Sequence, residues 1–510
     1  MRTPFAPLLA VAAIALPVGA VDAADLVVGF SQDALTLDPA NHRKRETETI
    51  IRNVYDGLLT RDAAMNVVPE LAESYEQIDP TTWEFRLRQG VTFHDGSDLT
   101  AEDVKFTFDR LTKEGAMGGQ TSPRQSLLGP LQDVEVVDDH TVRFKLASPW
   151  PILPAMLPFQ EVVSEDFVEQ VGSDGLATQA SGAGPFKLAE WRRGDAVIME
   201  RFDDYYGGSP DIPPEGPANV ERVIFQIIPE NSSRVAALLA GDVHIINELP
   251  VSAIGQVESN PETEVIKVNG TRTFFVALNN AKAPFDDVRV RKALNYALDK
   301  QLIIDKVLDG TATPLSGVMS PDAFAFNADL EAYEHDLEKA KALLAEAGYP
   351  DGFEATLDTE GAFKDTAEAI AALLDRAGIK VNVQVWEGAV LTPVWREAEQ
   401  RQERDMYLTS WGNGSLDPSD IMLPTLRTEG RGNSAGYSNP KVDELLDGAD
   451  IEMDPEKRKE MYLEAQAIVN DEAPWIFLWL PQDIYGVSSR VKGWQPSPDS
   501  RINLHDVVLE

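Results

Sequence analysis

The chain of 510 residues contains no cysteine. This absence excludes disulfide bonds, thiolate zinc sites, iron–sulfur clusters, a cysteine nucleophile and a lipid anchor on an N-terminal cysteine. Histidine is nearly as scarce, and the six histidines are scattered without the spacing of metal ligands. We therefore expect neither a metal site nor a cofactor in this protein.

Positive charge is also in short supply. The 45 lysine and arginine residues face 84 aspartate and glutamate residues, which leaves a formal net charge of -39 at pH 7. The field of such a protein repels phosphate groups, so nucleic acids and anionic membrane surfaces are poor partners. We expect no nucleic-acid binding.

Long apolar runs are confined to the N-terminus. Residues 1–23 are typical of an export signal: Arg2 precedes an apolar stretch over residues 5–21, and cleavage is expected after Ala23. A transmembrane anchor is the alternative, but Pro4 lies just before the stretch and Pro7 and Pro17 interrupt it. No later segment has the roughly 18 consecutive apolar residues of a membrane-spanning helix, so we expect an exported, freely diffusing protein without membrane insertion.

Helices and strands are predicted to alternate along the rest of the chain. Residues 25–30 form an apolar run typical of a buried strand, and residues 83–88 alternate apolar with charged side chains, as a half-buried strand does. Apolar residues over 47–59 are spaced for one face of a helix. Residues 336–347 predict a capped helix, and the alternating residues 380–385 predict a strand after it. This alternation predicts the α/β class.

No catalytic motif accompanies this framework. The chain has no Gly-x-Ser-x-Gly, His-Glu-x-x-His or Gly-x-x-x-x-Gly-Lys sequence. His94 followed by Asp95 suggests a catalytic pair, but Gly96 favours a turn there. We therefore predict that the protein is not an enzyme.

The first candidate binding segment is a run of cations in an acidic chain: His42, Arg43, Lys44 and Arg45. Ligands of α/β domains bind beyond strand ends, and this run follows the first predicted strand and its loop. A planar guanidinium such as that of Arg43 or Arg45 donates two parallel hydrogen bonds to a carboxylate. The alternative is a solvated basic face that pairs with nearby glutamates, and the sequence leaves both open.

The second candidate binding segment begins at Trp411. Gly412, Asn413 and Gly414 follow it, so the loop combines an aromatic wall with exposed backbone donors and acceptors. A core tryptophan beside an ordinary capped helix is the alternative. Arg396 and Arg124 are further candidate partners for an anion.

Six segments resemble the signature regions of the family 5 extracellular solute-binding proteins, the dipeptide-, oligopeptide- and nickel-binding group of ABC importers. They are 69–75 (PELAESY), 83–96 (WEFRLRQGVTFHDG), 100–108 (TAEDVKFTF), 181–191 (SGAGPFKLAEW), 283–294 (APFDDVRVRKAL) and 437–446 (YSNPKVDELL). Their number and order make the resemblance specific, and it runs from about Asp25 to the C-terminus.

The resemblance implies a two-lobed periplasmic-binding-protein fold of the large class. Lobe I is expected over 24–270 and 482–510, with an extra subdomain at about 47–180, and lobe II over 271–481. Two crossover segments join the lobes, and the ligand cleft lies between them. Such proteins work in the periplasm as monomers that deliver a small molecule or short peptide to ABC permease subunits and perform no chemistry.

One departure from the family bears on the ligand. In the peptide-binding members an aspartate three residues after the tryptophan pairs with the peptide ammonium, and here that position is Gly414. Together with the cations at 42–45, this loss points to an anionic ligand, such as an acidic or γ-linked peptide, a glutathione-like peptide or an opine-like conjugate. A nickel chelate is disfavoured, since His335 is lobe II's only histidine. A periplasmic chaperone or a secreted hydrolase on this fold remains the alternative.

Overall fold

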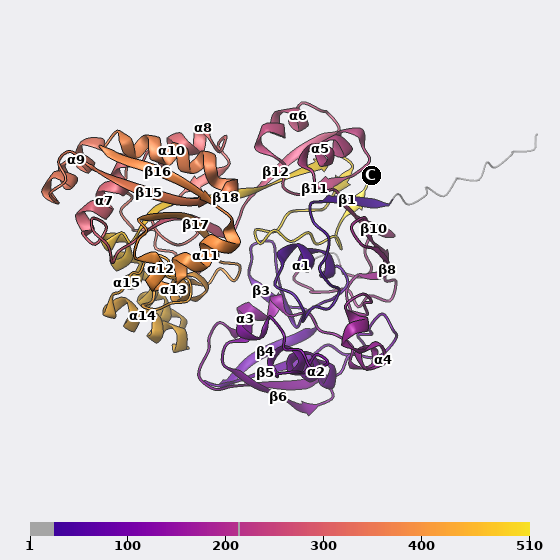
Figure 1. The fold of residues 1–510 in the computed structure, drawn as a ribbon. Coiled ribbons are helices and arrows are strands. Elements are labelled where there is room, and N and C mark those ends of the chain that lie inside the picture. The colour runs from indigo at the N-terminus through magenta and orange to yellow at the C-terminus, as the bar shows by residue number, and fades with distance from the viewer. Residues whose placement is uncertain (1–24, 213–214) are drawn as a thin grey trace, which may run out of the picture.

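The computed structural model describes residues 25–212 and 215–510. The chain forms two α/β lobes that lie side by side (Figure 1). Both lobes share one twelve-stranded sheet, in the order β16-β15-β17-β13-β18-β11-β1-β10-β9-β8, with β12 and β14 attached to β18. The α/β class and the two-lobed architecture expected from the resemblance are thus confirmed. The export signal predicted at 1–23 lies outside the described residues.

Lobe I contains the N-terminal part of the shared sheet. β1 pairs in parallel with β10 and β11, and β9 and β8 extend the sheet as antiparallel strands. Its strands are β1 Leu26–Phe30, β8 Phe186–Arg192, β9 Ala196–Arg201, β10 Arg222–Ile227, β11 Ile245–Ile246 and β12 Thr263–Asn269, and its helices are α1 Arg45–Ile51, α4 Glu165–Leu176, α5 Asn231–Ala240 and α6 Ile254–Glu258. The predicted strand at 25–30 corresponds to β1.

A second sheet builds the lower part of lobe I in Figure 1. Its order is β4-β5-β7-β6, and the rings of Phe85, Phe108 and Phe144 pack between it and α2. The elements are β4 Ala72–Asp79, β5 Thr82–Leu87, β6 Leu131–Asp138, β7 Thr141–Leu146, α2 Ala101–Thr112 and α3 Leu153–Met156, with the short hairpin β2 Leu59–Arg61 and β3 Val67–Pro69 above them.

Lobe II covers both faces of its sheet with helices. Along β13, Phe275 and Ala277 belong to one apolar core while Val276 and Leu278 belong to the other, as expected for a strand whose successive side chains point to opposite faces. The strands are β13 Arg272–Leu278, β14 Ala312–Pro314, β15 Phe353–Glu360, β16 Ile379–Trp386 and β17 Met406–Gly412. The helices are α7 Val288–Ala297, α8 Lys300–Lys306, α9 Leu337–Glu346, α10 Lys364–Asp375, α11 Gly388–Arg396, α12 Ala398–Arg401, α13 Pro418–Leu426, α14 Pro440–Ile451 and α15 Pro455–Glu472.

One strand, β18 (Trp475–Ser488), runs from lobe II into lobe I (Figure 1). Its first half pairs with β13 and β14, and its second half pairs with β11 and β12. The chain also crosses between β12 and β13, where Gly270 donates a hydrogen bond to Pro481 O at 3.0 Å. We propose from these crossings that the lobe limits predicted at 270/271 and 481/482 are the actual ones.

The helix predicted over 47–59 is wrong in extent. Helix α1 covers only Arg45–Ile51, and Leu59 already belongs to β2. All residues from 52 to 61 are buried. Their apolar side chains therefore pack in all directions, and their spacing does not mark one face of a helix. As a consequence Arg45 occupies the first turn of a helix instead of the preceding loop.

A buried ion pair ties the loop after β1 to the second sheet of lobe I. Arg110 of α2 donates to both carboxylate oxygens of Asp38, at 3.2 and 2.7 Å, and the two residues are only 2% and 1% exposed. Asp38 also accepts a hydrogen bond from the backbone N–H of Ala40. This contact fixes the loop that carries the basic run at 42–45.

We expect Arg110→Met to lower the free energy of unfolding by about 3–5 kcal/mol, because it leaves the Asp38 carboxylate buried without its counter-ion. Urea unfolding measures this loss. The matched control is Arg192→Met, whose ion pair with Asp195 is half exposed, and its loss should not exceed about 1 kcal/mol. Equal losses in the two variants would show that the buried pair contributes no more to the free energy of unfolding than the exposed pair does.

Candidate ligand site between the lobes

A cavity of about 550 Å³ lies between the lobes. Its walls come from α1 and the loop before it, from the second sheet region of lobe I, and from β17 and the loops of lobe II. Eight of its nineteen lining residues are arginine or lysine and four are aspartate or glutamate, which reverses the charge balance of the whole chain. The basic ones are Arg43, Lys44, Arg45, Arg124, Arg272, Arg396, Arg431 and Arg501.

The basic run at 42–45 forms part of the lobe I wall, but its first member does not reach the cavity. His42 is buried, with its Nε2 atom 3.2 Å from Nη1 of Arg124 and its Nδ1 atom 3.2 Å from Lys44 O. Burial and the charge of Arg124 lower the pKa of His42 to about 4, so its ring is neutral and Nε2 accepts from the guanidinium. His42 therefore orients Arg124, which lines the cavity together with Arg43 and Arg45.

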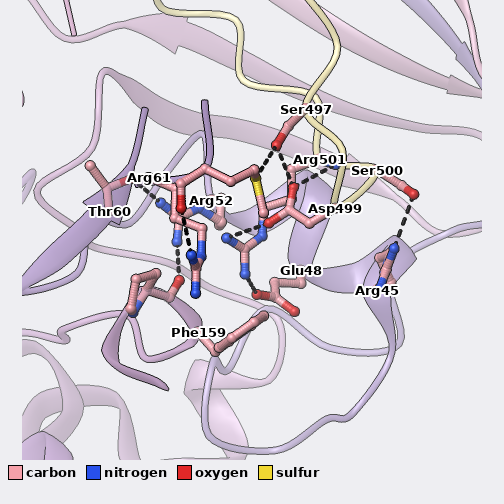
Figure 2. Close-up of polar contacts among 12 residues, drawn as sticks. Arg45, Glu48, Arg52, Thr60, Arg61, Phe159, Ser497, Asp499, Ser500 and Arg501 are labelled. Atoms are coloured by element: carbon pink, nitrogen blue, oxygen red, sulfur yellow. Dashed lines mark hydrogen bonds and ion pairs between the residues drawn. The ribbon is translucent and has the colours of Figure 1, made fainter. Parts of the chain in front are cut away.

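A network of buried ion pairs supports this wall (Figure 2). Arg501 lies between Glu48 of α1 and Asp499, and pairs with both carboxylates. Burial acts to raise the pKa of Glu48, but the surrounding arginines, Arg501 first, lower it overall. Arg52 adds a bond to Thr60 Oγ1 at 2.9 Å. These arginines are structural, since their charges are matched by acids in the protein.

The lobe II wall is built around Trp411, at the end of β17. Its indole N–H donates to Asp420 O at 2.8 Å, and its ring lies so close to Gly432 that a Cβ atom there would be 2.4 Å from it. The guanidinium carbons of Arg396 and Arg431 lie 5.6 and 4.9 Å from the ring centroid. Trp411 thus holds two cations by cation–π contact without neutralising their charge.

A second pair of arginines meets across the cleft near the crossover segments. Arg45 of lobe I donates to Ser500 Oγ at 3.0 Å, and Arg272 of lobe II donates to Ser410 Oγ at 3.3 Å. Desolvation and the nearby charge of Arg45 lower the pKa of Arg272. The two guanidiniums are therefore close enough to repel each other.

The loop after Trp411 makes the direct contact between the lobes. A Cβ atom at Gly414 would lie 3.3 Å from Cζ of Phe159 and 4.0 Å from Nη2 of Arg45, so the position of the family's aspartate faces a lobe I aromatic ring and a cation. Asn413 is buried, and its backbone N–H donates to Thr271 O. Arg61 completes the contact by donating to Ser415 O at 3.1 Å.

Of the residues predicted for binding, eight line the cavity: Arg43, Lys44, Arg45, Arg124, Arg396, Trp411, Gly412 and Gly414. His42 and Asn413 lie behind it. Sequence reasoning missed Arg272, Arg431, Phe159 and Asp420. The position of Arg272, directly before the apolar run at 273–278, was a usable signal, because strand ends border clefts in α/β domains. Arg431 lies in a loop with no such signal.

Six cavity arginines have no acidic partner among the described residues, and one of them, Arg124, is buried and hydrogen-bonded to His42 and to Phe159 O. The other five are exposed or half-buried. Among the described residues, no ion pair involves Arg43, Arg45, Arg272, Arg396 or Arg431, whereas Arg501 has two. Arg43, Arg272, Arg396 and Arg431 are also exposed to solvent. Uncompensated and accessible guanidiniums on both walls of one cavity can donate hydrogen bonds to the oxygens of an anion.

Other kinds of site find no support in the described part of the chain. Over residues 25–212 and 215–510 no group of three or more histidine, aspartate or glutamate side chains is arranged to hold a metal ion. Within the same residues no helix is both long and apolar enough to cross a membrane.

The fold and the interlobe cavity define a two-lobed solute-binding protein. The chain belongs to the bacterial extracellular solute-binding proteins of family 5, because the sequence model described as "Bacterial extracellular solute-binding proteins, family 5 Middle" matches residues 66–433. The resemblance noted in the sequence is thereby confirmed.

Individual relatives agree with this assignment over nearly the whole chain. Heme-binding protein A of Haemophilus influenzae is 30% identical over 477 residues, which are 88% of this chain and 85% of the relative. The glutathione-binding protein GsiB of Salmonella typhi is 28% identical over 502 residues, which are 96% of each. The structure of HbpA2 from Haemophilus parasuis superimposes with a TM-score of 0.87 at 28% identity, covering 96% of this chain and 100% of that one.

We expect the buried, neutral His42 to make the protein less stable in acid. Between its ordinary pKa of 6.5 and its folded pKa of about 4, the unfolded chain binds a proton that the folded protein excludes, so the free energy of unfolding falls as the pH falls through this window. The contribution reaches at most about 3 kcal/mol. Urea unfolding of the wild type and His42→Gln at pH 7.5, 6 and 5 measures it. The stability advantage of the wild type should shrink toward pH 5, and a constant difference would contradict the prediction.

Proposed function

We propose that this protein is the periplasmic solute-binding component of an ABC importer and captures a peptide-like or amino-acid-conjugate anion between its lobes. It binds as a monomer, performs no chemistry and delivers the solute to the permease subunits. Export by the N-terminal signal, with release of the mature chain into the periplasm, belongs to the same proposal. Arg43, Arg45, Trp411, Arg396 and the loop 412–414 are its proposed ligand-binding residues.

The observation that carries this proposal is the set of five unpaired and solvent-accessible arginines around one cavity. The protein as a whole has a net charge of -39, yet among the described residues none of the four acids that line the cavity forms an ion pair with these five arginines. Each unpaired guanidinium offers a forked pair of donors that matches a carboxylate. An anionic solute therefore accepts charge-assisted hydrogen bonds from guanidiniums that form no ion pair within the protein.

Size and kinship support the same class of ligand. A cavity of about 550 Å³ falls within the usual range for small-molecule sites, which is roughly 300–1,000 Å³. One relative is a glutathione-binding protein, and glutathione is a peptide-like solute with more than one carboxylate. Gly414 also supports an anionic ligand, because it replaces the aspartate that would bind a peptide ammonium.

We expect anionic peptides to raise the melting temperature of the mature protein after co-purified ligand has been removed. A ligand at 100 times its dissociation constant adds about 2.7 kcal/mol of stability, which shifts the melting temperature by a few degrees. Arg431→Gln should abolish most of the shift, whereas Arg427→Gln, which breaks an exposed pair with Asp447, should keep it. A shift produced by neutral dipeptides and not by acidic ones would contradict the anionic ligand.

We expect Gly414→Asp to weaken binding of an anionic ligand, because the new carboxylate would project toward Arg45 and neutralise it. Gly414→Asn is the matched control, since it has the same shape and meets Phe159 in the same way without the charge. Titration calorimetry should show the aspartate variant binding at least about 10-fold more weakly than the asparagine variant. Equal affinities would mean that Arg45 does not contact the ligand.

A further inference from the structure

The unpaired, solvent-accessible arginines of the cavity fall into two groups. The tryptophan cluster consists of Arg43, Arg396 and Arg431, and the crossover cluster consists of Arg45 and Arg272. The guanidiniums of Arg396 and Arg431 lie over the ring of Trp411, whereas those of Arg272 and Arg45 lie beside Gly412 and Gly414. The charge of Arg43 acts on Arg431, and that of Arg45 acts on Arg272. The two clusters therefore occupy different positions along the Trp411 loop in one cavity.

The tryptophan cluster concentrates three cations against a single acid. Arg396 and Arg431 lie over the ring of Trp411, and the described residues provide neither with a side-chain hydrogen bond. The acid, Asp420, already accepts from Ser415 Oγ at 3.1 Å, and burial raises its pKa. The cluster therefore retains a strong excess of positive charge.

The crossover cluster lies on the other side of the Trp411 loop. A Cβ atom at Gly412 would be 3.2 Å from Nη2 of Arg272, and one at Gly414 would be 4.0 Å from Nη2 of Arg45, so the two guanidiniums flank neighbouring positions of this loop. Asp483 approaches from β18 and is held by the hydroxyl of Ser500, and burial raises its pKa. Neither arginine forms an ion pair with it.

Each cluster combines arginines from both lobes. Arg43 comes from lobe I and faces Arg396 and Arg431 of lobe II, and Arg45 likewise faces Arg272. Like charges brought together from opposite walls repel, so closure around an empty cavity is opposed at two places. An anion bound in one cluster removes the repulsion there only, and the other remains.

We propose that the ligand carries two separate carboxylates, one bound by the tryptophan cluster and one by the crossover cluster. The inference rests on the proposed function and narrows it to dicarboxylate peptide-like solutes. One solute reaches both clusters because both line the same cavity. Each carboxylate then links the two lobes, so both are required for a stable closed form.

Titration calorimetry with matched probes tests the two-carboxylate requirement. The probes are γ-Glu-Ala, Ala-Glu and reduced glutathione, each also with either one of its carboxylates converted to the amide. For at least one probe, the dicarboxylate should bind the mature wild-type protein about 10- to 100-fold more tightly than either monoamide, as expected for the loss of charge-assisted hydrogen bonds.

Two variants assign each carboxylate to its cluster. Arg431→Gln and Arg272→Gln should each weaken the dicarboxylate about 10- to 100-fold. In Arg431→Gln, amidation of the carboxylate bound by the tryptophan cluster should lower the affinity little further, because the arginine that it contacts is already missing. In Arg272→Gln, the same should hold for amidation of the carboxylate bound by the crossover cluster. Arg427→Gln, outside the cavity, should behave as the wild type.

The outcomes separate this inference from the proposed function. Equal binding of a dicarboxylate and both of its monoamides, or losses in the two variants that follow the same carboxylate, would overturn the inference while leaving an anion-binding importer component. Binding of neutral peptides alone, with no affinity for any dicarboxylate probe, would overturn the inference and the anionic ligand together.

Discussion

The architecture depends on one strand that forms backbone hydrogen bonds with strands of both lobes. β18 completes the sheet of lobe II with its first half and that of lobe I with its second half, so its hydrogen bonds join both bodies. The adjacent crossing between β12 and β13 is bonded to it through Gly270. The two segments that cross between the lobes are thus hydrogen-bonded to each other.

Arginines in the interior of lobe I differ from those around the cavity between the lobes. In the interior of lobe I, Arg501, Arg52 and Arg110 are matched by acids, since an uncompensated buried charge costs several kcal/mol. Around the cavity the same residue type is left unmatched and accessible. Paired arginines such as Arg501 support the wall, and the unpaired arginines on it are the residues that we propose bind an anionic solute.

Local patterns predicted several elements well. Asp336 accepts from the backbone N–H of Lys339 and caps α9 as expected, and the strand predicted at 380–385 lies within β16. The helix expected over 47–59 failed because complete burial imitates helical periodicity. At the site, the cationic run and the Trp411 loop were found from residue types alone, yet His42 and Asn413 lie behind the cavity wall, since their orientation depends on contacts with Arg124 and Thr271.

The sequence by itself determined the family, the α/β class and the excess of cations in the loop before α1, because these follow from local composition and from motifs in a fixed order. The tertiary structure alone decided which cations line the cavity. Arg43, Arg272 and Arg431 are far apart in the chain and line one cavity only in the folded protein, where none of them has an ion-pair partner among the described residues. Recognition at a cleft between two bodies is a long-range arrangement, and no local pattern encodes it.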